Sequence, residues 1–155
     1  KGQETQIIVS RSSNEFLGRL LQTEIPEIAS GIIEIKDIVR QPGERSKVAV
    51  ASRERDVDPI GACIGPKGSR ILAISKELGG EKIDIVLWSP NPGAYAKSAL
   101  NPARIERVIP VSTADKSLEA LVSRDQLSLA IGKKGINVKL ASKLTGWKIA
   151  IKELG

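Results

Sequence analysis

The chain contains no histidine, and Cys63 is its only cysteine. Histidine is the commonest metal ligand and the commonest general base, so its absence removes both. One cysteine without histidine cannot build a zinc site of the usual kind, and it leaves no Ser-His or Cys-His pair for nucleophilic catalysis. A disulfide framework is excluded as well, which favours a reducing compartment. These absences argue against an enzyme and against a metal or other cofactor. Carboxylate-based chemistry stays open, but no acidic pair stands out in the sequence.

The sequence also lacks long apolar runs. No stretch approaches the roughly 20 apolar residues that a membrane helix needs, and no secretory signal opens the chain. We therefore expect a cytoplasmic protein with no membrane partner. Methionine is absent even at position 1, which indicates that the natural chain begins upstream.

Aromatic residues are scarce: only Phe16, Trp88, Tyr95 and Trp147 are present. A protein that reads single strands by stacking bases on aromatic side chains needs more of them, so an aromatic stacking platform is not expected. We predict that Trp88 and Trp147 belong to the core, and that Cys63 is buried and inert.

Positive charge is concentrated in one half of the chain. Residues 1–90 carry 13 Lys or Arg and 13 Asp or Glu, whereas residues 91–155 carry 11 and 5. The whole net charge of +6 therefore lies in the second half. A phosphate-rich partner would use such charge, because bound lysines and arginines displace condensed counterions. The charge alone fits equally well a surface that keeps a small domain soluble.

Two segments 67 residues apart repeat the same frame. Residues 64–68 are IGPKG and residues 131–135 are IGKKG, preceded at equal spacing by Asp58 and Asp125. A single G-x-x-G is common by chance, but two copies with matching flanks indicate an internal duplication of a unit of roughly 65 residues. We call residues 65–68 the first loop and residues 132–135 the second loop.

The expected elements follow one order in both halves. In the first half they are a strand at 5–10, a helix at 14–21, a connector at 26–31, strands at 32–39 and 46–51 around a turn, helices at 58–64 and from 69, and a strand at 82–88. In the second half they are a helix at 92–100, strands at 107–112 and 117–122, helices at 125–131 and 136–145, and a strand at 147–152. This pattern predicts an α+β fold with two three-stranded sheets, each with helices packed on one face. Residues 89–93 (SPNPG) interrupt the pattern, so we predict domains at 1–89 and 90–155.

Each loop joins two helices, which suits it to hold an anion. The start of the following helix has free N–H groups, and the helix dipole favours negative charge there. Glycine lets the backbone come close because no Cβ intervenes. Lys67, Lys133 and Lys134 add charge, while Pro66 removes a donor from the first loop. Such a loop is typical of the KH module, which clamps four nucleotides of single-stranded backbone. We expect the second loop to grip phosphate more strongly.

Other interpretations of these residues are weaker. The P-loop pattern fails because its second glycine would fall at Pro66, and the dinucleotide fingerprint is absent. The loop glycines could be simple helix stops, but the duplication argues against that. Asp56 and Asp58 alternate as in a metal-binding loop, yet Asp58 before Pro59 is better explained as a helix start.

Longer segments resemble the tandem KH domains of the NusA family of bacterial transcription factors. The segments similar to the first domain are VDPIGACIG (57–65), GSR (68–70) and ELGGEKIDIVLW (77–88). Those similar to the second domain are LAIG (129–132), NVKLA (137–141) and TGW (145–147). The resemblance covers nearly the whole chain.

The resemblance implies two type II KH domains that form one rigid unit and bind nascent single-stranded RNA, including ribosomal RNA leaders. It implies a role in transcription pausing, termination and antitermination. RNA polymerase binding would belong to the full-length protein, because the family's polymerase-binding domain and OB-like domain have no counterpart here. Residues 5–11 would be the seam with the latter.

The candidate RNA-binding residues are the two loops and their immediate neighbours: Ile64, Gly65, Pro66, Lys67, Gly68, Ser69, Arg70, Ile71, Ile131, Gly132, Lys133, Lys134, Gly135, Ile136, Asn137 and Val138. Two four-nucleotide clamps predict a continuous footprint of about eight or more nucleotides. Two alternatives remain: a KH protein of ribosome assembly, and a protein-interaction module with vestigial loops. The presence of both lysines in the second loop argues against vestigial loops.

Overall fold

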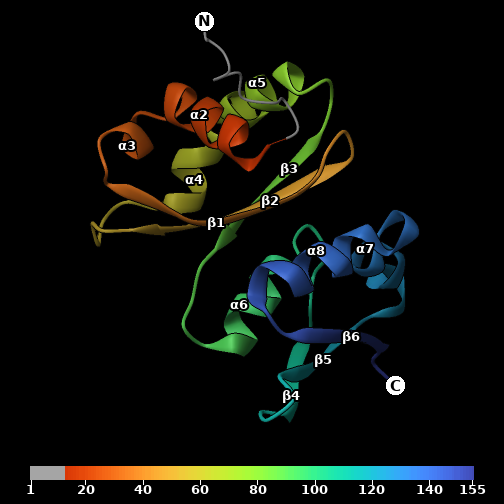
Figure 1. Cartoon of the computed structure of the whole chain (residues 1–155). Helices are drawn as coiled ribbons and strands as arrows, with labels where there is room; N and C mark the ends of the chain where they lie inside the picture. The colour runs from red at the N-terminus through yellow and green to blue at the C-terminus, as the bar shows by residue number, and fades with distance from the viewer. Residues whose placement is uncertain (1–12) are drawn as a thin grey trace, which may run out of the picture.

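The computed structural model describes residues 13–155, which form two similar α+β units (Figure 1). The first unit contains α2 (Asn14–Glu24), α3 (Pro26–Ala29), β1 (Ile33–Gln41), β2 (Arg45–Ser52), α4 (Pro59–Ile64), the 3-10 turn η1 (Pro66–Gly68), α5 (Ser69–Glu77) and β3 (Lys82–Leu87). The second contains α6 (Pro92–Ala99), β4 (Arg107–Ser112), β5 (Ser117–Val122), η2 (Arg124–Gln126), α7 (Leu127–Ile131), η3 (Lys133–Gly135), α8 (Ile136–Thr145) and β6 (Lys148–Glu153).

Both sheets have the same topology. In the first, β2 pairs antiparallel with β1 and parallel with β3. In the second, β5 pairs antiparallel with β4 and parallel with β6. The prediction of two three-stranded sheets with helices is confirmed, and the shared topology agrees with the duplication seen in the sequence.

Local sequence signals account for most element ends. Asp58 caps α4 by accepting a hydrogen bond from the Ile60 amide, and Asn91 caps α6 in the same way through the Ala94 amide. Gly146 ends α8 in the left-handed conformation. The expected connector at 26–31 instead contains α3, because Pro26 is well suited to a first helical position. The expected strand at 5–10 lies outside the described residues.

The helices α2, α4 and α5 cover one face of the first sheet (Figure 1). Leu17 and Leu21 of α2 and Ile74 of α5 pack there in one buried cluster with Val48 and Ile85 of the sheet. Alternate residues of a strand point to opposite faces, so the neighbours of these sheet residues face away from the helices.

The other face of the first sheet is covered by the second unit. Val39, Ala49 and Val86 of the sheet belong to the same buried cluster as Leu100 and Leu140 of the second unit. Figure 1 shows α6 and α8 lying between the two sheets. The molecule is therefore layered as helices, sheet, helices, sheet, and the middle helices serve both units.

A buried ion pair closes one end of the first unit. Arg40 donates from Nε and Nη2 to the Glu81 carboxylate at 2.9 and 2.6 Å, and Glu81 is fully buried. The Gly43 amide donates to the same carboxylate, and Arg40 Nη1 donates to the Ser13 carbonyl. The pair thus joins the start of α2 to the β1–β2 turn.

Cys63 lies in the core of the first unit, at the end of α4. Burial raises the pKa of its thiol to about 11, and the nearby Glu27 carboxylate acts in the same direction. We expect the folded protein at pH 8 to react with iodoacetamide at least about tenfold more slowly than the unfolded chain in urea, because the reactive thiolate is scarce and shielded. Mass spectrometry of the alkylated fraction over time measures this; equal rates would contradict the burial.

Candidate nucleic-acid interface

The two loops have nearly identical backbones. Gly65 has φ 79° and ψ 170°, and Gly132 has φ 81° and ψ 166°. Lys67 and Lys134 are left-handed, at φ 54° and 57°. In both loops the last glycine donates its amide hydrogen to the carbonyl of the first at 3.0 Å. The same shape is therefore built twice, from IGPKG and from IGKKG.

The first glycine of each loop occupies backbone space that is essentially closed to other residues. It is also crowded. A Cβ added to Gly132 would lie 2.7 Å from both the Cβ and the amide nitrogen of Asn137, and one added to Gly65 would lie 2.7 Å from Cγ of Arg70. These glycines are required by the loop and are more than helix stops.

The lysines of the loops are exposed. Within residues 13–155, the side chains of Lys67, Lys133 and Lys134 make neither a hydrogen bond nor an ion pair. Three unpaired ammonium groups are thus presented at the starts of α5 and α8, where the helix dipole adds positive potential. Pro66 stands where the second loop has Lys133, so the first loop has one charge and one N–H fewer.

Apolar side chains flank the loops. Ile64, Ile71, Ile136 and Val138 are half-buried and pack partly against the two cores. Ile131 is exposed beside the second loop. Ser69 is also exposed, at the first position of α5.

Two exposed leucines beside the loops were missed from the sequence. Leu72 is 62% exposed on α5 and Leu129 is 42% exposed on α7. Helical spacing contained the signal, because each lies on the turn adjoining a loop but away from the buried face of its helix. They widen the apolar surface beside each loop.

Arg70 and Asn137 are not free at the surface. Both stand five positions after the first glycine of their loop. Arg70 Nη1 donates to the Ala62 carbonyl at 2.7 Å and to Glu27 at 2.9 Å. Asn137 is buried. Their direct contact with RNA stays a prediction, but the structure gives both side chains partners within the protein.

A groove of about 650 Å³ lies beside the second loop, between the two units. One wall comes from the second unit and includes Leu129, Gly132 and Lys133. The other comes from the first unit and includes Arg45 and Lys82. Glu44 and Asp125 also line the groove, so basic side chains outnumber acidic ones by three to two. Only the folded chain brings these walls together, so no local sequence pattern could have indicated the groove.

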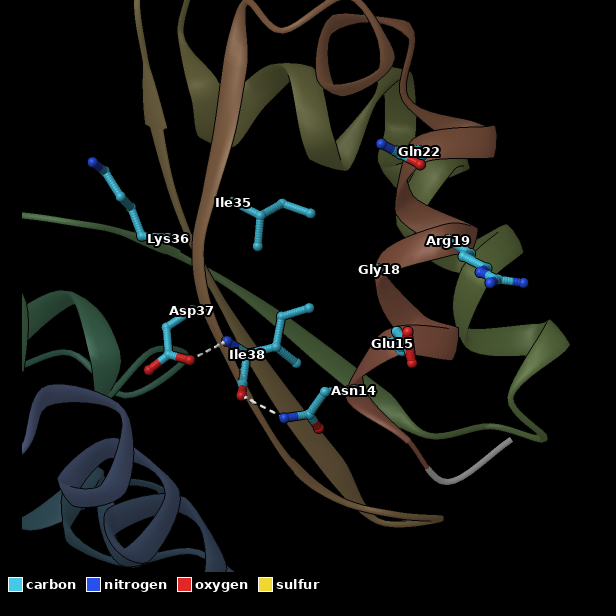
Figure 2. A pocket seen from close by; sticks show the side chains of 9 residues that line it. All are labelled: Asn14, Glu15, Gly18, Arg19, Gln22, Ile35, Lys36, Asp37 and Ile38. Atoms are coloured by element: carbon cyan, nitrogen blue, oxygen red, sulfur yellow. Dashed lines mark hydrogen bonds between the residues drawn. The ribbon is translucent and has the colours of Figure 1, made fainter. Parts of the chain in front are cut away.

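A second groove, of about 480 Å³, lies between α2 and β1 (Figure 2). Gly18, Ile35 and Ile38 line it, with two basic and two acidic side chains around them. Asn14 donates to the Ile38 carbonyl, and the Asp37 carboxylate accepts from the Ile38 amide. Balanced charge and occupied strand-edge groups make it a poor phosphate site.

Residues 13–155 contain no group of three His, Cys, Asp or Glu side chains arranged to hold a metal ion. None of the helices in these residues has the length and apolar character needed to cross a bilayer.

Comparison with known proteins agrees with this geometry. Residues 11–88 match the NusA-like first KH domain, and residues 92–155 match the NusA-like second KH domain. The transcription termination/antitermination protein NusA of Thermus thermophilus is 54% identical over 95% of this chain, and that of Halalkalibacterium halodurans is 50% identical over 95%. The chain spans 38% of the length of each of these two relatives.

A solved structure has the same fold. The crystal structure of APE1850 superposes with a TM-score of 0.60, covering 89% of this chain and 96% of that one, at 24% identity.

Proposed function

Because the chain belongs to the family of NusA-like tandem KH domains, we propose that it binds single-stranded RNA through its two loops. The observation that carries the proposal is the second loop. Its first residue has a backbone conformation that only glycine adopts readily, and the loop presents two unpaired lysines at the start of a ten-residue helix. Backbone N–H groups, helix dipole and ammonium groups then act together on one phosphate-bearing strand.

The occupant of the loops is a single strand rather than a duplex. The apolar residues beside each loop offer a surface only to bases that are splayed away from a partner strand. Scarce aromatics leave aliphatic contacts and backbone clamping as the means of holding the strand.

The groove between the units extends the path of the strand. A strand leaving the second loop at Lys133 would meet Arg45 and Lys82 of the first unit along this groove. This supports one continuous footprint across both domains, of about eight or more nucleotides.

In the cell, the strand is a nascent transcript, and the activity is regulation of transcription. The relatives are named as transcription termination/antitermination proteins, which supports a binding role rather than catalysis. We infer that the full-length protein acts in the cytoplasm and affects pausing, termination and antitermination. Its contact with RNA polymerase is proposed for the full-length protein, and ribosomal RNA leaders are the proposed targets.

The proposal is tested by reversing charge at the second loop. We expect Lys133→Asp/Lys134→Asp to weaken binding of a labelled twelve-nucleotide RNA at least about tenfold. The slope of log K against log salt concentration should become less steep by about 1.4, because two phosphate contacts are lost. Fluorescence anisotropy at several salt concentrations measures both values.

The matched control is Lys148→Glu/Lys152→Glu on β6, which makes the same change of charge away from the loops. It should bind RNA nearly as the wild type does. If the loop variant is folded by circular dichroism and binds no worse than this control, the loops are not phosphate clamps and a protein partner becomes the better hypothesis.

A further inference from the structure

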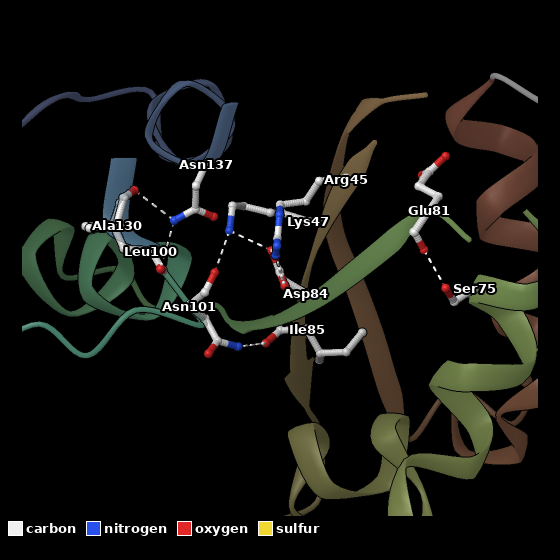
Figure 3. Close-up of polar contacts among 10 residues, drawn as sticks. All are labelled: Arg45, Lys47, Ser75, Glu81, Asp84, Ile85, Leu100, Asn101, Ala130 and Asn137. Carbon is white, nitrogen blue, oxygen red and sulfur yellow. Dashed lines mark hydrogen bonds and ion pairs between the residues drawn. The ribbon is translucent and has the colours of Figure 1, made fainter. Parts of the chain in front are cut away.

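Asn137 is the first buried polar residue after the second loop, and only 2% of it is exposed. Its Nδ2 donates two hydrogen bonds, to the Ala130 carbonyl at 2.9 Å and to the Leu100 carbonyl at 3.1 Å (Figure 3). It also packs against Gly132, where no Cβ would fit. Asn137, two positions after the loop, therefore contacts both the first glycine of the loop and the end of the helix before it.

The first of these hydrogen bonds fixes the helix before the loop. Ala130 lies in the last turn of α7, where carbonyls have no partner within the helix. Arg70 makes a similar hydrogen bond in the first unit, to the Ala62 carbonyl, which lies one residue earlier relative to its loop. Both loops are thus braced from the same position, but Arg70 is held by Glu27 of its own unit.

The second hydrogen bond leads to the other unit. Leu100 and Asn101 follow α6 directly, and the Asn101 carbonyl accepts a hydrogen bond from Lys47 Nζ at 2.7 Å. Lys47 lies on β2 of the first sheet, is fully buried, and pairs with the Asp84 carboxylate at 2.8 Å. Figure 3 shows this series of contacts from Asn137 to Arg45 and Asp84.

The buried polar groups of Asn137 and Lys47 are better explained by a role in positioning the second loop than by a role in stabilising the fold. The Oδ1 atom of Asn137 is buried and has no hydrogen-bond partner within residues 13–155. A buried acceptor without a partner is costly, as is a buried ammonium group. An apolar residue at position 137 would avoid the cost of the unpartnered Oδ1 atom. The two hydrogen bonds from Nδ2 must therefore supply an orientation that packing alone does not.

We propose that Asn137 is a positioning residue that couples the second loop to the first domain through Leu100, Asn101 and the Lys47–Asp84 pair. The proposal rests on the proposed RNA-binding function of that loop. Neither Asn137 nor Lys47 needs to touch RNA. The loop holds its lysines toward the strand only when the second unit is docked on the first sheet, so RNA affinity depends on a buried contact in another domain.

The test is Lys47→Met, with Lys76→Met as the matched control on the exposed side of α5. Asp84 keeps its hydrogen bonds from Arg45, so we expect the first sheet to stay folded. We expect Lys47→Met to weaken binding of the twelve-nucleotide RNA about tenfold, and Asn137→Leu to weaken it similarly, while Lys76→Met has no effect. In the Lys133→Ala/Lys134→Ala background neither change should weaken binding further, because the lysines they position are absent.

A second measurement is independent of RNA. In amide NMR spectra, Lys47→Met should shift the Gly132 and Gly135 signals and leave those of Gly65 and Gly68 in place. Unchanged Gly132 signals together with unchanged RNA affinity in Lys47→Met would overturn the coupling. Full additivity of Asn137→Leu with the lysine changes would overturn it as well. If the lysine changes alone do not affect binding, the proposed function fails, whereas the NMR result still decides whether the loop is coupled.

Discussion

Gly132→Ala is expected to lower the free energy of unfolding by about 3 kcal/mol and to remove RNA binding at the second loop. Two effects add. Alanine is strained at φ 81° and ψ 166°, and its Cβ would lie 2.7 Å from the backbone nitrogen of Asn137. Because that neighbour is backbone in the first turn of α8, relief requires the helix to move.

Urea denaturation and RNA titration of the same samples measure this prediction. The control is Gly135→Ala, where φ is 72° but a Cβ meets nothing within 4 Å, so only the left-handed strain of about 1 kcal/mol remains. Gly65→Ala should be intermediate, since its Cβ meets side-chain atoms of Arg70 rather than backbone. Equal losses of unfolding free energy in Gly132→Ala and Gly135→Ala would show that crowding against Asn137 is unimportant.

Glu81→Gln is expected to destabilise the first unit by about 3–5 kcal/mol, because it breaks a buried ion pair in which Arg40 donates two hydrogen bonds to the Glu81 carboxylate. The control is Glu34→Gln. Glu34 makes a half-exposed pair with Lys36, so its removal should cost less than about 1 kcal/mol. Chemical denaturation at pH 7 measures the free energy of unfolding of both variants. If both lose similarly little, the buried Arg40–Glu81 pair contributes little to stability.

The same variant changes how stability depends on pH. Burial by itself would raise the pKa of Glu81, but hydrogen bonds from Arg40 and the Gly43 amide, with the Arg40 charge, outweigh it and hold the pKa below its ordinary value. A carboxyl with a depressed folded pKa stabilises above its unfolded pKa of about 4.3 and loses that contribution as pH falls through the folded value. The gap between wild type and Glu81→Gln should therefore narrow below about pH 4.

Most of the elements could be predicted because their signals are local. The strands at 107–112 and 117–122 and the helix at 136–145 have the predicted bounds, since alternation, a turn and Gly146 mark them directly. At 124–126 the chain forms a 3-10 turn before α7, where a single helix from 125 was expected. The division into domains at 89/90 stays a prediction.

The loops could be predicted, but their surroundings could not. The repeat of IGPKG and IGKKG indicates two equivalent sites without any structure. Alternation along β2 places Lys47 and Val48 on opposite faces of the sheet. No local sequence pattern indicates that the face with Lys47 is covered by another unit. The burial of Lys47 and Asn137 comes from contacts 54 and 37 positions apart in the chain, and sequence periodicity carries no information about those.

The shared middle layer of helices has a consequence for synthesis on the ribosome. The first sheet is complete once β3 has emerged, but α8, which covers its second face, ends only at Thr145. At about 5–20 residues per second, Val39, Ala49 and Val86 stay uncovered for several seconds during each round of translation. We therefore expect the first domain to expose an apolar face during synthesis until the second domain has folded onto it.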